Sequence, residues 1–303
     1  MQSIYAMHQN GSDNLEKEEK FLFHSIENVQ DLYLIMLSAL VEIRQKEEEY
    51  LHKASKKHLA TAEERNPNRK FIDNKILVFL AENKSLSDAL EKRKINNWSR
   101  NDDYILLMLD EIRQSELYKK YMATAVSSVE ADRDFVADMF MELIAPNEKL
   151  YDYLEDHKLT WVDDIPLVNT QIIKQLKQID PSDALSFRVP KLYKDEEDSD
   201  FVKDLFRKTV LNEIEFGKEY INKTPNWDTE RIAEIDTIIL KMAICEFQRF
   251  PSIPVKVTIN EYLEIAKEYS TPKSSIFING ILDNLVKEFQ AAGKLNKAGR
   301  GLM

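Results

Sequence analysis

The side chains that most often carry chemistry are few and scattered in this chain. Its five histidines stand at positions 8, 24, 52, 58 and 157, and none has a second histidine or a cysteine at the spacing of a metal site. The single cysteine, Cys245, lies on the apolar face of a predicted helix, which favours a buried thiol over a nucleophile. The glycines form no phosphate-binding loop, and no nucleophile-elbow motif occurs. We therefore predict a binding protein rather than an enzyme, with no catalytic residue, metal site or cofactor.

Composition limits both the fold and the compartment. Only 6 of the 303 residues are glycine and 9 are proline, so tight turns are rare and an all-β fold is disfavoured. The lone cysteine leaves no disulfide framework, no apolar run is long enough to span a membrane, and no secretory signal is visible. The formal net charge of −11 argues against a broad basic surface but leaves room for a local basic face. We predict a cytoplasmic, all-α protein that has no membrane partner.

The first strong helical pattern is an apolar seam from Leu22 to Ile43 in steps of four and three residues. It predicts one long helix that starts near Glu16 and continues to about His58. An intramolecular bundle is favoured over an intermolecular coiled coil, because the seam is short for a free-standing coil. Residues 1–130 are therefore assigned to an N-terminal helical bundle that contains this helix.

Residues 131–198 form the next predicted segment, an inserted helical unit followed by an acidic linker. The acidic run at 195–198 is interpreted as a solvated part of that linker. The pattern from Asp134 to Ile173 recurs from Asp200 to Ile239 as helix, short helix, tryptophan loop and apolar helix. This echo indicates either a duplicated helical unit or a chance likeness between amphipathic helices.

Residues 199–303 are predicted to form a C-terminal helical domain. Ile235, Ile239 and Phe247 belong to a helix that is apolar on more than one face, which is typical of a deeply buried helix.

Three local signals predict where the later helices begin and how they pack. Thr258 and Glu261 have the spacing of a capping box, which predicts a helix start at Thr258. Thr271-Pro272 predicts the start of the last helix, because proline is favoured in the first turn. Gly280 inside that helix is expected to admit the helix of Ala266 at close range.

Three motifs follow one another in this C-terminal third. They are the runs 254–261 (P-V-K-V-T-I-N-E), 266–267 (A-K) and 277–283 (F-I-N-G-I-L-D). With the apolar helix before them, they resemble the NusB family of transcription antitermination factors. The close resemblance covers about residues 200–286, and Gln2 and Tyr5 resemble the end of the first helix of the family. The resemblance implies NusB-like helical bundles, enlarged here by additional helices within a large insertion that spans residues 30–198.

The resemblance also implies a function and partners. Members of the family bind the boxA segment of nascent ribosomal-operon RNA together with the tenth small-subunit ribosomal protein, NusE, and the complex joins RNA polymerase and suppresses premature termination. Single-stranded RNA is recognised by stacking on aromatic rings and by lysine contacts to phosphate. The implied RNA-binding residues are Gln2, Tyr5, Lys256, Lys267, Tyr269, Lys273, Phe277 and Asn279. Asp236 is implied to pair with a basic residue of the ribosomal protein.

The sequence departs from the family at two places. Lys273 stands at a position that is acidic in some relatives, which would favour RNA locally, and the start of the chain differs as well. Family members carry an Arg-rich stretch before the position of Gln2, which is an electrostatic contact to RNA phosphates, and this sequence begins inside that first helix. We expect either a longer natural start or a replacement, for which Lys287, Lys294, Lys297 and Arg300 are candidates. Two other functions remain open: a protein-only scaffold that has lost RNA binding, and an RNA cytosine methyltransferase with a NusB-like domain. The second is disfavoured because the motifs of a methyltransferase are missing.

Overall fold

The computed structural model describes residues 1–124, 128–221, 232–295 and 297. Throughout these residues the chain forms helices and turns, with no strand, which confirms the predicted all-α fold. None of the described helices is both long and apolar enough to cross a lipid bilayer.

The chain divides into two units, which we call unit 1 (residues 1–23 and 193–303) and unit 2 (residues 24–192). This division differs from the three segments expected from the sequence. Residues 1–23 join the C-terminal part, because Ile4 and Met7 of the first helix are buried in the same core as Ile238. The segments on either side of residue 130 share one core instead of two, which makes 24–192 a single unit.

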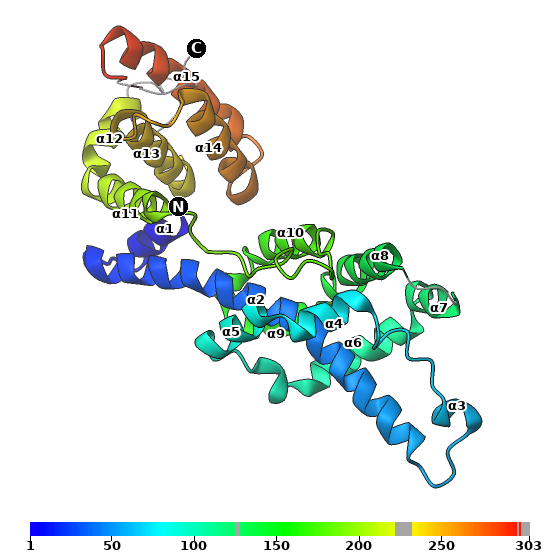
Figure 1. The fold of residues 1–303 in the computed structure, drawn as a ribbon. Coiled ribbons are helices and arrows are strands. Elements are labelled where there is room, and N and C mark those ends of the chain that lie inside the picture. The colour runs from blue at the N-terminus through cyan, green and yellow to red at the C-terminus, as the bar shows by residue number, and fades with distance from the viewer. Residues whose placement is uncertain (125–127, 222–231, 296, 298–303) are drawn as a thin grey trace. The chain divides into compact units, whose positions relative to one another are not determined.

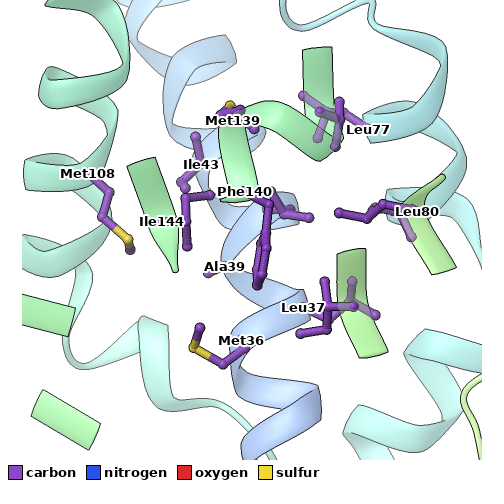
Figure 2. Packing of buried hydrophobic residues seen from close by; sticks show 14 of the residues in the cluster. Met36, Leu37, Ala39, Ile43, Leu77, Leu80, Met108, Met139, Phe140 and Ile144 are labelled. Carbon is purple, nitrogen blue, oxygen red and sulfur yellow. The ribbon is translucent and has the colours of Figure 1, made fainter. Parts of the chain in front are cut away.

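The apolar seam forms one long helix, α2 (Leu15–Ser55), as predicted, and unit 2 is built around its residues 24–55 (Figure 1). Every residue from Leu32 to Leu40 is buried, so other helices surround this part of α2 on all sides. Met36, Leu37 and Ile43 pack among apolar side chains from several later helices (Figure 2). The prediction of an intramolecular bundle is therefore confirmed for the second half of the seam. The other helices of unit 2 are α3 (Ala62–Arg65), α4 (Lys75–Glu82), α5 (Lys84–Arg93), α6 (Asp102–Gln114), α7 (Glu116–Ala123), α8 (Val129–Met139), α9 (Glu148–His157) and α10 (Ile165–Leu176), with short 3₁₀ turns η1 (Asn97–Ser99) and η3 (Leu159–Trp161) and a π-helical turn η2 (Phe140–Ile144).

Polar residues start many of these helices by accepting hydrogen bonds from otherwise unpaired backbone N–H groups. Asn83 caps α5, Ser115 caps α7 and Asn147 caps α9 through their side-chain oxygens. Asp195 does the same for α11 (Glu196–Leu211), since its carboxylate accepts from the backbone of Glu197 and Asp198. The acidic run is therefore the start of a helix, and the linker interpretation was wrong for these residues.

Unit 1 packs around α13 (Glu234–Arg249), where the residues from Ile238 to Phe247 are buried apart from Lys241. This confirms the predicted buried helix, and it confirms Cys245 as a core residue. The helices α1 (Gln2–Gln9), α11, α12 (Glu213–Ile221), α14 (Val255–Tyr269) and α15 (Ser274–Ala291) pack against α13. Matching positions of the two similar segments, 134–173 and 200–239, are buried alike: Phe140 and Phe206 are both buried, and so are Ile172 and Ile238. Trp227 of the second segment lies outside the described residues.

Two local predictions in unit 1 were wrong. Helix α14 starts at Val255, three residues before Thr258. The Thr258 side chain is buried, and its hydroxyl donates a hydrogen bond of 2.6 Å to the carboxylate of Glu246. Gly280 lies on an exposed part of α15, and a Cβ added there would meet nothing within 4 Å, so no helix approaches it closely. The last helix starts at Ser274, within three residues of the predicted start.

Candidate functional site

A buried carboxylate at the start of α13 organises the region that holds several predicted RNA-binding residues. Asp236 is only 5% exposed, and its two oxygens accept hydrogen bonds from Ser270 Oγ at 2.6 Å and Ser274 Oγ at 2.7 Å. Thr271 Oγ1 lies 2.9 Å from Ser274 Oγ. We call Asp236, Ser270, Thr271 and Ser274 the Asp236 joint. It fastens the turn between α14 and α15 to the first turn of α13.

The turn held by this joint carries three of the predicted RNA-binding residues. Tyr269 directly precedes Ser270, Lys273 directly precedes Ser274, and Phe277 lies one helical turn beyond it. Lys273 is exposed, while the rings of Tyr269 and Phe277 are half-buried. The two aromatic residues and the lysine therefore lie within nine residues of one another, at the end of α14, in the turn and in the first part of α15.

Helix α1 reaches the same end of α13 through a second set of contacts. Glu234 accepts from Gln9 Nε2 at 2.6 Å and lies 3.0 Å from His8 Nδ1, and Glu213 lies 2.8 Å from His8 Nε2. Tyr5 stands one turn earlier in α1 and is half-buried. Glu234 and Asp236 share the first turn of α13, so the end of α1 and the α14–α15 turn are both attached there. Gln2 is exposed at the beginning of α1.

The remaining predicted residues lie elsewhere on unit 1. Lys256 is in the first turn of α14 and Tyr269 is its last residue, which places them about 20 Å apart along the helix. Lys267 is exposed and forms an ion pair with Glu264 at 2.5 Å. Asn279 lies beyond Phe277 on α15, and its side chain donates to Asp283 Oδ2 at 3.4 Å. No hydrogen bond or ion pair between described residues joins these three side chains to the Asp236 joint.

Asp236 was expected to face a basic residue of a partner, and the structure gives its carboxylate two hydroxyl partners inside unit 1 instead. Its direct effect is to position the turn. Sequence reasoning missed Ser270, Thr271 and Ser274 as members of the site. The signal that could have found them is the density of hydroxyl residues between two helices, because such groups satisfy a buried carboxylate.

A second buried carboxylate supports the helix that leads to the turn. Glu246 accepts from Thr258 Oγ1 at 2.6 Å and from Tyr262 Oη at 3.2 Å, and these contacts join α13 to the middle of α14. Burial, together with the neighbouring Glu246, raises the pKa of Tyr262 well above its ordinary value. Burial also raises the pKa of the Cys245 thiol to about 11, so this thiol stays protonated at neutral pH.

The C-terminal lysines suggested as a replacement basic contact are mostly engaged within unit 1. Lys294 forms an ion pair with Glu219 at 3.0 Å, and Lys297 donates to the backbone carbonyls of Glu246 and Phe250. Lys287 is exposed on α15, and Arg300 lies outside the described residues. Within the described part of the chain, no group of three or more histidine, cysteine or acidic side chains is arranged to hold a metal ion.

Comparison with known proteins extends the resemblance seen in the sequence. The sequence profile of the NusB family matches residues 167–287, a range that begins inside α10 and ends in α15. No solved structure matches the chain.

Three curated relatives bear the name transcription antitermination protein NusB. The protein from Salinibacter ruber is 45% identical over 117 residues, which cover 38% of this chain and 72% of the relative. The protein from Koribacter versatilis is 41% identical over 100 residues, covering 33% of this chain and 68% of the relative. The protein from Chloroherpeton thalassium is 40% identical over 104 residues, covering 34% of this chain and 49% of the relative. With its C-terminal motifs, its helical core around α13 and this level of identity, the chain belongs to the NusB family.

Proposed function

We propose that this chain is an antitermination adaptor that binds single-stranded boxA-type RNA through unit 1, together with the tenth small-subunit ribosomal protein. The complex would then join RNA polymerase. The curated relatives are named for transcription antitermination, which supports the same process for this chain. The proposal involves binding alone and requires no catalytic step.

The observation that carries the proposal is the turn fastened by the Asp236 joint. Tyr269 and Phe277 have half-buried aromatic rings, the side-chain type on which unpaired bases stack, and Lys273 has an exposed charge for phosphate. Lys273 also directly precedes the first turn of α15, whose free backbone N–H groups favour an anion at that end. The joint keeps the turn in one conformation before RNA arrives, which reduces the entropy lost on binding.

The role of the other candidate residues is secondary in this proposal. Gln2 and Tyr5 lie on α1, whose end is attached beside the joint, and would add contacts to RNA there. Lys256 would contact a longer stretch of RNA, because it lies about 20 Å from Tyr269 along α14, whereas Lys267 and Asn279 are close to the turn in sequence and would contact RNA beside it. The ribosomal protein would contact unit 1 near Asp236.

A fluorescence anisotropy titration of the full chain with boxA RNA tests the proposal, with and without the ribosomal protein. Wild-type protein should bind with an affinity that falls as salt rises, because lysines displace counterions from phosphates. The Lys273→Gln variant should weaken binding and reduce the salt slope by about 0.7, the value for one contact to single-stranded nucleic acid. Lys203→Gln is the matched control, since Lys203 is exposed on α11 and forms no ion pair with a described residue.

Absence of salt-dependent RNA binding, both alone and with the ribosomal protein, would contradict the proposal. Binding of the ribosomal protein without RNA would then favour the alternative, a protein-only scaffold. An equal loss in the Lys273→Gln and Lys203→Gln variants would show that the turn has no special role.

A further inference from the structure

Helix α5 of unit 2 ends in an unusual way. Its last turn is closed by Lys94, which has φ 56° and ψ 37° and so lies in the left-handed region. Glycine is the usual residue there, as Gly293 with φ 64° shows at the end of α15, because a Cβ is disfavoured in this conformation. Lys94 is exposed, and its side chain makes no hydrogen bond or ion pair with any residue that the structure describes. The fold alone therefore gives no reason for lysine at this position.

Lys94 belongs to a short basic segment, residues 92–100, which we call the α5 corner. The corner contains Lys92, Arg93, Lys94 and Arg100 and no acidic residue, in a chain whose net charge is −11. Lys92, Lys94 and Arg100 are exposed, and none forms an ion pair with a carboxylate of the described residues. The nearest acidic residues in sequence, Glu91 and Asp102, flank the corner, and Asp102 is paired with Lys46 at 3.0 Å.

The α5 corner is attached to α2 by one partly buried and one buried side chain. Arg93 donates to Asp31 Oδ1 at 2.5 Å and to the carbonyl of Glu27 at 2.6 Å, both on α2. Trp98 is buried, and its indole N–H donates to the carbonyl of Ile35 and to Ser38 Oγ, each at 3.1 Å. The three exposed cations therefore extend from a rigid base, which favours binding because little order has to be imposed.

Two structural explanations account for only part of this pattern. Cations stabilise the C-terminal end of a helix, which explains Lys92 and Arg93 but neither the left-handed Lys94 nor Arg100. A protein partner would need an apolar or aromatic anchor, and no large apolar side chain between residues 84 and 103 is exposed. Contact with a phosphate backbone needs only positive charge. The composition of the corner thus favours nucleic acid over an acidic protein.

We propose that the α5 corner is a second RNA contact, in which Lys92, Lys94 and Arg100 bind phosphates of single-stranded RNA beyond the segment bound by unit 1. This inference rests on the proposed function of unit 1. In this proposal, the inserted unit lets the chain bind a longer stretch of RNA than unit 1 binds alone.

Lys94→Gly provides a sharp test, because it should improve folding and weaken binding at once. Glycine adopts the left-handed backbone conformation without the strain that the Cβ of lysine causes, so the melting temperature of unit 2 should rise by about 2–4 °C. Binding to an RNA that extends beyond boxA should lose about 0.7 from its salt slope, while binding to a short boxA RNA should not change. Lys94→Arg should keep the wild-type slope, and Lys120→Gln, an exposed lysine of α7, should change neither measurement.

The outcomes separate this inference from the function of unit 1. If wild-type protein binds the short RNA and the long RNA equally well, or if Lys94→Gly leaves the long-RNA slope unchanged, the α5 corner is no RNA contact. An acidic protein surface would then be its remaining ligand. If wild-type protein binds neither RNA, the proposed function itself fails, and this inference fails with it.

Discussion

Each unit of the molecule contains a buried carboxylate that joins helices by accepting hydrogen bonds from neutral donors. In unit 1, Asp236 accepts hydrogen bonds from Ser270 and Ser274. In unit 2, Asp132 is fully buried and accepts from Tyr121 Oη at 2.7 Å and from the backbone N–H of Lys75 at 3.0 Å. Both carboxylates are satisfied by neutral donors, which is the condition for a polar group to remain buried.

The two buried carboxylates differ in the part of the structure that each one holds in place. The groups around Asp132 belong to the core. The Tyr121 ring stacks on Phe135 with ring centroids 3.9 Å apart, and Asn74, which caps α4, donates through Nδ2 to Tyr121 Oη and to the backbone carbonyl of Asp132. The donors around Asp236 belong to a surface turn that presents Lys273 to solvent. The same chemistry therefore serves core stability in unit 2 and the position of candidate binding residues in unit 1.

The largest expected effect comes from Asp132→Ala. This change leaves the Tyr121 hydroxyl and the Lys75 N–H without their buried acceptor, so unit 2 should lose about 3 kcal/mol of unfolding free energy. Hydrogen exchange of the α4 and α8 amides measures the loss. Binding of a short boxA RNA should stay at the wild-type level. A parallel loss of that binding would show that Asp132, like Asp236, affects the RNA-binding region.

Asp236→Ala should have a smaller effect on stability and an additional effect on RNA. Unit 1 should lose about 2 kcal/mol, because Ser270 and Ser274 lie 3.0 Å apart and can still bond to each other. Release of the turn should weaken RNA binding by about tenfold, equivalent to 1.4 kcal/mol of binding free energy. Titration at a temperature where the variant is folded separates the two effects, and unchanged affinity would show that the joint does not position the site.

Thr258→Val should have the smallest effect and sharpens the account of α14. Valine keeps the shape but removes the hydroxyl that Glu246 accepts, so unit 1 should lose about 1 kcal/mol in urea unfolding. Glu261→Ala is the matched control and should cost almost nothing, because Glu261 is exposed and does not belong to a capping box at the start of α14. Equal losses in the two variants would restore the capping interpretation.

The sequence predicted the parts of this fold that depend on helical periodicity. The long helix α2 and the buried helix α13 were predictable because their apolar residues recur at helical spacing. This spacing can be recognised in the sequence without knowing which helices pack against them. The start of α14 was not, because Pro254 lets the helix begin early and the distant Glu246 takes the hydroxyl of Thr258. At Thr258, the hydrogen bond to the distant Glu246 is formed in place of the local capping box that the sequence spacing predicts.

The candidate site was predictable only through resemblance. Tyr269, Lys273 and Phe277 stand out because of the motifs around them, whereas the hydroxyl residues that hold them have no periodic signal. Lys256 follows from the same motifs, yet it lies about 20 Å from Tyr269 along α14, because the two residues stand at opposite ends of that helix. The α5 corner was not predicted, because a left-handed lysine is visible only in three dimensions.

Hydrogen exchange of the full chain with and without boxA RNA and the ribosomal protein tests the central claim most directly. Backbone amides of residues 267–280 should exchange more slowly when RNA is added, and a short boxA RNA should leave the amides of α8 in unit 2 unchanged. Binding that leaves the exchange of residues 267–280 unaltered would contradict the claim that the turn fastened by Asp236 receives the RNA.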